Sequence, residues 1–111
     1  MKAEPWVLAQ ITSNRNLLVP FYLSLSWLYY EKDEIIVGDE LYGTICDRLN
    51  AEWDEIEHWH KGLIDRSSLA AGTGYYLQYP ERVASAAWAL YLRFNPPAPK
   101  RRKRRGVKGR G

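Results

Sequence analysis

Asp39 begins the most strongly patterned stretch of this 111-residue chain. Its carboxylate suits the N-cap of a helix, and Glu40 adds a second negative charge at the positive end of the helix dipole. From there, apolar side chains recur at three- and four-residue steps: Tyr42, Ile45, Cys46, Leu49, Trp53 and Ile56. This spacing predicts one long amphipathic helix from Asp39 to His60, buried on one face and acidic on the other, with Gly62 as its left-handed stop.

The segment before Asp39 predicts the partner of this helix. Pro20 is suited to a first helical turn, and residues 21–30 read FYLSLSWLYY. Large apolar side chains at every second position of this run are compatible with a strand. We favour a helix, which would form a helical hairpin with the next element. Residues 31–38 would connect the two, with Ile35 and Val37 placed in the core.

The flanking segments also favour helices. Pro5 and the apolar run after it predict a short N-terminal helix that ends near Ile11. Asp65 can cap a short turn closed by Gly72. Residues 75–79 could be extended or irregular. Pro80 opens the last helix, whose core-facing stripe would comprise Val83, Ala86, Ala87, Leu90, Tyr91 and Phe94. The predicted fold class is therefore all-α, a helical hairpin with a C-terminal amphipathic helix.

Length and composition predict one small domain. With 46% apolar residues, a chain of this size can bury roughly two-thirds of its unfolded surface in one core. We expect a compact domain in residues 1–94, a Pro-rich spacer in 95–99 and a disordered basic tail in 100–111. The lone cysteine, Cys46, excludes an internal disulfide and suits a reduced, cytoplasmic protein. No apolar run is long enough to span a membrane, and no signal peptide is evident.

The tail holds half of the basic side chains of the protein. The chain has sixteen Lys and Arg against thirteen Asp and Glu. Eight of the basic residues lie in the tail, which has no acid, so residues 1–99 carry a charge of −5 and the tail +8. Such a tail can neutralise phosphates of DNA or RNA, with little sequence preference. The candidate nucleic-acid-binding residues are Lys100, Arg101, Arg102, Lys103, Arg104, Arg105, Lys108 and Arg110. A solubility tail, a contact with an acidic protein and a targeting signal are the alternatives.

The common catalytic motifs are absent. The sequence AGTG lacks the Lys-Ser/Thr of a phosphate-binding loop, and there is no paired-cysteine metal motif or serine elbow. Asp54 and His58 lie one helical turn apart, but His60 would point elsewhere, so we expect no metal site. Cys46 lacks a neighbouring base and falls on the apolar face, so we expect no catalytic residue.

The central stretch resembles the N-terminal domain, called Ia, of bacterial NAD-dependent DNA ligases. That family has a Tyr-His pair ending one helix, a short loop, and an Asp-x-x-Tyr-Asp start to the next. Here LYYEKDEIIVGDELYGTICDRL aligns without a gap, and EHWHKGLID stands where the family has its Glu-His and Leu-Ile elements. The likeness covers about a third of the chain, roughly Trp27 to Asp65, and suggests a bacteriophage or bacterial origin.

In those ligases the domain holds the nicotinamide mononucleotide half of NAD. The resemblance implies cofactor-binding positions at Tyr29, Asp39 and Tyr42, with Tyr30 in place of the family's histidine and Gly43 in place of its second aspartate. The adenylation domain with its Lys-x-Asp-Gly nucleophile is missing, so the chain is not expected to act as a ligase alone.

Two main hypotheses follow. The first is a non-enzymatic, nucleic-acid-associated accessory protein whose tail binds the phosphate backbone while its aromatic-rich body contacts a partner. The second is a nucleotide-binding module for nicotinamide mononucleotide or NAD, with its residues exposed around one cleft. A third reading is an inhibitory or structural protein that binds another protein through its acidic face.

Overall fold

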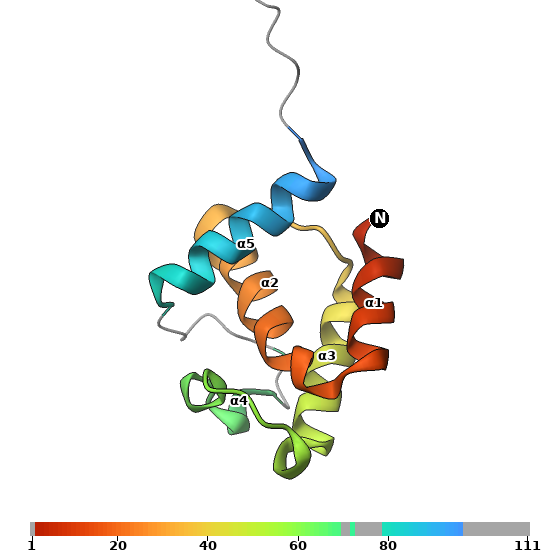
Figure 1. Ribbon diagram of the computed structural model, residues 1–111, viewed down its shortest axis with the longest axis vertical. Coiled ribbons are helices and arrows are strands. Elements are labelled where there is room, and N and C mark those ends of the chain that lie inside the picture. Colours follow the sequence, from red (N-terminus) through yellow and green to blue (C-terminus); the bar gives the residue numbers. More distant parts are fainter. Residues whose placement is uncertain (1, 70–71, 73–78, 97–111) are drawn as a thin grey trace, which may run out of the picture.

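The computed structural model describes residues 2–69, 72 and 79–96, and every regular element in them is a helix (Figure 1). The all-α prediction is confirmed. The predicted basic tail, most of the Pro-rich spacer and most of residues 75–79 lie outside the described residues. The elements are α1 (Ala3–Ser13), η1 (Arg15–Leu17), α2 (Leu18–Lys32), α3 (Asp39–Ala51), η2 (Trp53–Glu55), η3 (Lys61–Leu63), α4 (Arg66–Leu69) and α5 (Glu81–Phe94).

Helix α2 is the centre of the core. It packs against both α3 and α5, and most of its side chains are buried (Figure 1). A helix that is apolar nearly all round is stable only when neighbours cover it on several sides, which explains its place. The helical interpretation of residues 21–30 is therefore correct and the strand alternative is wrong. Pro20 lies in the first turn of α2, where its missing N–H removes no helical bond.

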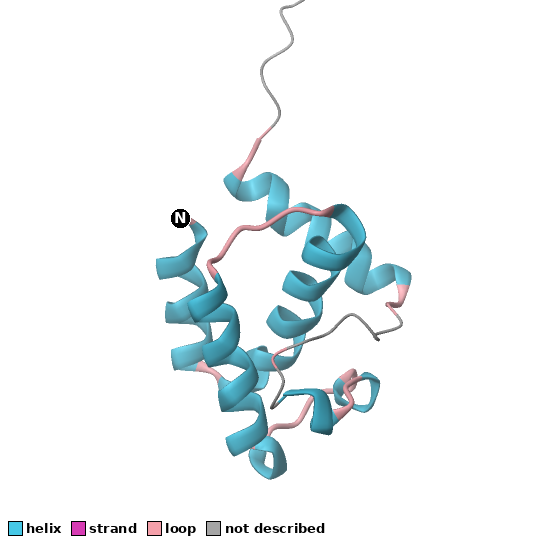
Figure 2. Ribbon diagram, turned by 180° about the vertical axis from the view of Figure 1, so that it is seen from behind, coloured by secondary structure: helices cyan, strands magenta, loops and turns pink. Residues whose placement is uncertain are grey.

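The connection between α2 and α3 crosses one end of the molecule and reaches α3 beside the start of α1 (Figure 2). Asp33 ends α2 in the left-handed conformation, with φ of 55°. Ile36 and Val37 then fill the core, whereas Ile35 is 53% exposed. The prediction that Ile35 is buried was wrong because the turn at Asp33 changes which side chains of this connection face inward.

The start of α3 is capped from another helix. The prediction that Asp39 is the N-cap was wrong: Gly38 holds that position, and Asp39 is the first helical residue. No side chain of Gly38 can accept a bond, but its own N–H donates to the Glu4 carboxylate of α1. Asp39 itself is exposed and is one of the residues that line the adjoining pocket.

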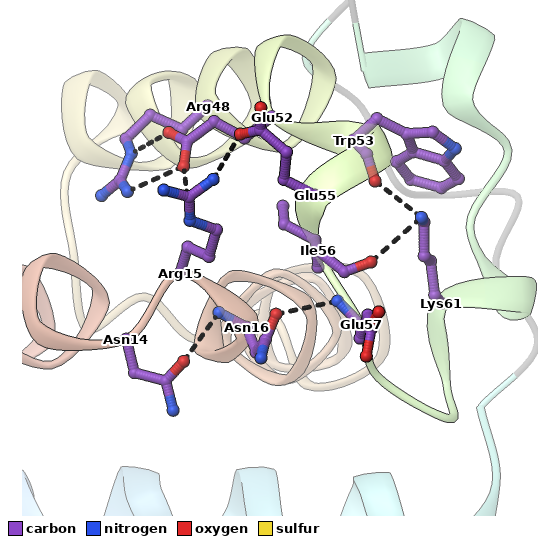
Figure 3. A network of polar contacts seen from close by, with 10 residues as sticks. All are labelled: Asn14, Arg15, Asn16, Arg48, Glu52, Trp53, Glu55, Ile56, Glu57 and Lys61. Carbon is purple, nitrogen blue, oxygen red and sulfur yellow. Dashed lines mark hydrogen bonds and ion pairs between the residues drawn. The ribbon is translucent and has the colours of Figure 1, made fainter.

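The long helix predicted to reach His60 ends instead at Ala51. Glu52 turns the chain, and Trp53–Glu55 forms a single 3₁₀ turn. The Nζ of Lys61 donates to the carbonyls of Trp53 and Ile56 at 2.6 and 3.1 Å, and the Asn16 side chain accepts from the N–H of Glu57 at 2.8 Å (Figure 3). These side chains satisfy three backbone polar groups of the turn, which lowers the cost of leaving the helix here.

Of the predictions for the short elements after this turn, the cap at Asp65 is confirmed and the stop at Gly62 is wrong. Asp65 accepts bonds from the backbone and hydroxyl of Ser67, as its predicted capping role requires, and Gly72 closes the segment with φ of 66°. Gly62 does not have a positive φ; it lies within η3, so its predicted role as a left-handed stop was wrong.

Helix α5 begins directly after Pro80, as expected, and closes the core over α2. Val83 and Ala87 are buried, while the larger apolar side chains nearer its end are partly buried against the core. Ala86 is exposed, so the predicted stripe was wrong at that one position. Helix α1 is confirmed and packs its Trp6 edge-on against Phe21, with ring centroids 5.6 Å apart.

Candidate functional site

A pocket of about 320 Å³ opens where the end of α2, its connection to α3 and the first turn of α3 meet. The residues that carry the resemblance to ligase domain Ia all line it: Tyr29, Tyr30, Asp39, Tyr42 and Gly43. These residues are thus gathered around one cleft, as the second hypothesis requires. Leu25, Leu28 and Val37 contribute an apolar floor.

Tyr42 is the fixed wall of this pocket. Its hydroxyl and that of Ser26 on α2 hydrogen-bond at 2.7 Å, and its ring stacks on Tyr22 with centroids 5.9 Å apart. Burial raises the pKa of Tyr42 well above its usual value. The phenol is therefore neutral at physiological pH. The hydrogen bond of its hydroxyl and the stacking of its ring together hold it in one orientation.

Tyr29 and Tyr30 form the more exposed wall. Their rings meet edge to face with centroids 4.8 Å apart. Tyr29 is 46% exposed and offers ring surface to a ligand. One wall is thus held by packing, whereas the other is accessible from solvent.

The polar lining is acidic. Asp39 and Glu34 both contribute to the pocket, and no Lys or Arg is among its lining residues in the described part of the chain. The Tyr91 hydroxyl donates a hydrogen bond to the Glu34 carboxylate. This bond is the largest cause that raises the pKa of Tyr91, and desolvation adds to it. Aromatic faces beside carboxylates suit a cationic ring and sugar hydroxyls. They provide no cation for a phosphate.

Gly43 leaves open space in this wall. A Cβ built on it would meet no atom within 4 Å. The first side-chain atom of an aspartate, which the family has at this position, would therefore meet no neighbour. The absence of this aspartate removes a carboxylate from the pocket but does not reshape the helix.

Cys46 is not a reactive thiol. It is 1% exposed on the inner face of α3, and burial is the largest cause that raises its pKa to about 11. At neutral pH the thiol is protonated, and a protonated buried thiol is a poor nucleophile. Its role is packing.

The histidines form a local turn. The Nδ1 of His58 accepts from the backbone N–H of His60 at 3.1 Å, and desolvation lowers the pKa of His58. Within the described part of the chain, no three His, Cys, Asp or Glu side chains come together as a metal site would require. None of the helices in that part has the length and apolar character to cross a membrane.

The structure also places side chains that the sequence patterns did not single out. Glu34 and Ile35 line the pocket because of the left-handed turn at Asp33. Trp59 stands exposed beside Arg82, which lies far away in the sequence. The eight basic tail residues, from Lys100 to Arg110, are outside the described residues.

The chain matches no family model, no curated protein and no solved structure. The resemblance to ligase domain Ia therefore stays a prediction from the sequence.

Proposed function

We propose that this protein is a non-enzymatic, nucleic-acid-associated accessory protein, in which the basic tail binds the phosphate backbone. The supporting observation is the separation of charge: eight basic side chains in residues 100–111, against a net charge of −5 in the rest of the chain. An acidic body repels phosphates, so most backbone contacts fall to the tail. Backbone binding of this kind weakens steeply with salt.

The test is a fluorescence-polarisation titration of the full-length protein and of a variant truncated after Asn95, against single- and double-stranded DNA and RNA. We expect binding by the full-length protein only, with affinity that falls as salt rises. A full-length variant with all eight tail cations changed to Gln is the matched control for tail length. Retained binding by the truncated or neutralised protein at physiological salt would refute the tail as the backbone contact.

A second function is favoured by the pocket. We propose that it captures the nicotinamide half of NAD or of nicotinamide mononucleotide. The support is the gathering of Tyr29, Tyr30, Asp39 and Tyr42 around one 320 Å³ cavity. A cationic nicotinamide ring would lie against the tyrosines, with Asp39 and Glu34 near the ring charge and the ribose hydroxyls. The lining fits the ring and ribose, but it offers no described cation for the phosphate.

Thermal shift with NAD, nicotinamide mononucleotide and nicotinamide riboside tests this second function. We expect stabilisation that is lost in Asp39→Asn. Glu40→Gln is the matched control, because Glu40 is the neighbouring acid in the first turn of α3 but does not line the pocket. No shift with any of the three compounds, or equal loss in both variants, would remove this function.

A further inference from the structure

Trp59 is the most exposed of the large apolar side chains in the described residues. It is 69% exposed and lies in the loop between η2 and η3. An indole this exposed gains little burial energy on folding, so most of its ring surface is left available to contact another molecule. Its ring stacks on His60 with centroids 4.5 Å apart and planes 12° apart, which holds it in a defined orientation.

Cations lie over the rings of this tryptophan and of Trp53, the preceding tryptophan in the chain. The guanidinium of Arg82, at the start of α5, lies 4.9 Å from the Trp59 ring. Lys61 and Arg66 lie 4.7 and 5.7 Å from the Trp53 ring. We call this set of six residues the aromatic–cationic surface. Its members are Trp53, Trp59, His60, Lys61, Arg66 and Arg82.

The cations of this surface have no carboxylate partners in the described part of the chain. Ion pairs there involve Arg15 and Arg48, which hold Glu52 and Glu55. Figure 3 shows Arg15 between these two glutamates on one side of the segment, and the Trp53 ring with Lys61 on the other. The polar network thus keeps two of the local acids away from the tryptophans.

The surface is not strongly cationic overall. Asp54, Glu57 and Glu81 are exposed close to it in sequence, and Asp65 is engaged by the hydroxyls of its own turn. Coulomb attraction alone would therefore bind a polyanion weakly here. Stacking on an exposed ring, with one or two cations beside it for phosphates, is the interaction that this combination supports.

We propose that the aromatic–cationic surface binds single-stranded nucleic acid by stacking an unpaired base on Trp59. The base takes the place of the Arg82 guanidinium over the ring, and Arg82 then contacts the adjoining phosphate. This inference rests on the proposed nucleic-acid function and adds strand selectivity to it. The tail contacts backbone of either kind, whereas only an unpaired base can stack on a side chain. Because the tail raises the local concentration of the strand near the body, a weak stacking contact suffices to favour single strands.

The test compares full-length protein with Trp59→Ala, using a labelled twelve-nucleotide oligothymidine and a labelled duplex at equal salt. We expect the affinity of Trp59→Ala for the single strand to fall by about tenfold, which lies within the usual effect of one stacked base. Duplex affinity should be unchanged. Trp59→Tyr should restore most of the selectivity, because a phenol ring also stacks.

Trp88→Ala removes another exposed tryptophan, on α5, and serves as the control. It should leave the ratio of single-strand to duplex affinity unchanged. Far-UV circular dichroism and a thermal melt establish that each variant is folded. An unchanged ratio in Trp59→Ala, an equal loss for both strands, or an equal loss in Trp88→Ala would each overturn the inference.

Arg82→Gln tests the phosphate contact separately. We expect the slope of log affinity against log salt for the single strand to fall by about 1. Arg93→Gln is matched to it, since Arg93 lies 4.4 Å from the ring of the half-buried Trp6 elsewhere on the body. Equal slopes in the two variants would contradict a phosphate contact at Arg82.

The outcomes separate this inference from the proposed function. If full-length protein binds neither strand at physiological salt, both fail. If it binds through the tail and Trp59→Ala has wild-type selectivity, only the stacking site fails, and the exposed tryptophan is then better explained by contact with a protein.

Discussion

Helix α2 and the turn segment from Glu52 to Arg66 are stabilised in opposite ways. In α2 the backbone N–H and C=O groups pair with one another within the helix, and the side chains are mostly apolar and buried. Ser24 and Ser26 are its only buried polar side chains. In the turn segment the backbone is irregular, and side chains such as Lys61 supply hydrogen bonds to its carbonyls. Its buried apolar residues are Ile56 and Ile64. The comparison shows that buried apolar side chains are concentrated in α2. The turn segment buries few apolar side chains and exposes an aromatic one.

The difference has a functional side. A buried helix can only position other elements, and α2 does so by holding Tyr42 through Ser26. The turn segment, by contrast, presents Trp59 to solvent because no regular packing surface forces the ring inward. The candidate pocket and the exposed Trp59 therefore lie at the C-terminal end of α2 and in the turn segment.

The largest expected effect is in α2. Leu23→Ala removes a fully buried side chain and should lower the free energy of unfolding by about 2 to 5 kcal/mol, because the cavity cannot collapse completely. Urea denaturation measures it. Leu8→Ala, at a half-exposed leucine of α1, is the control and should cost much less. Equal losses would mean that α2 is not the centre of stability.

The turn segment should respond to the loss of one donor. Lys61→Met keeps the apolar stem but removes the bonds to the carbonyls of Trp53 and Ile56, so we expect a loss of about 1 kcal/mol. The value is modest because Trp53 is partly exposed and its carbonyl can bind water instead. Lys2→Met, at an exposed lysine, should have no measurable effect in the same urea titration. A loss as large as that of Leu23→Ala would erase the contrast between the two regions.

A smaller effect, of opposite sign, is expected in α3. Gly43→Ala should stabilise the protein by about 0.5 to 1 kcal/mol, since alanine is the better helix former and its Cβ meets no atom within 4 Å. Gly38→Ala is the contrasting variant: its Cβ would lie 3.1 Å from the Glu4 carboxylate that caps α3. A thermal melt should rank Gly43→Ala above wild type and Gly38→Ala below it.

The smallest effect is a dependence on pH in the turn segment. The pKa of His58 is lowered by desolvation from its ordinary value of 6.5, so the unfolded chain binds the proton more readily. The contribution of the neutral imidazole to stability is therefore present above pH 6.5 and is lost as the pH falls through the folded pKa.

Protonation would also occupy the Nδ1 that accepts from the N–H of His60. His58→Asn retains an acceptor two residues before that N–H but does not titrate. Its stability should change less than that of wild type between pH 7.5 and 5.5 in parallel urea titrations. Identical pH profiles would show that this turn does not depend on the charge of His58.

The sequence predicted the elements whose apolar pattern and tertiary role agree. The start of α5 at Pro80 and the buried character of α2 follow from local signals. The end of α3 could not be predicted in this way, because Trp53 and Ile56 continue the helical spacing beyond Ala51. What ends the helix is a set of contacts with Asn16, Lys61 and Arg15, which no local pattern contains.

Some residues of the candidate site could likewise be predicted from the sequence, and others could not. The resemblance to ligase domain Ia pointed to Tyr29, Tyr30, Asp39 and Tyr42, and these four do line one pocket. Whether the pocket binds a nucleotide stays a prediction. Glu34 could not be assigned to it from the sequence, since its place depends on the positive φ of Asp33. The pairing of Trp59 with Arg82 is likewise a product of tertiary structure.

The burial of Cys46 makes this thiol a probe of local unfolding around α3. It is the only cysteine in the chain, and at 1% exposure with a pKa of about 11 its thiol is protected from alkylation while the inner face of α3 is packed against the core. The rate at which a thiol reagent modifies the native protein at neutral pH is then set by how often that interface separates. If a ligand bridges α2 and α3, it will slow this modification in proportion to the fraction of protein that it occupies, even when it causes no visible change of structure.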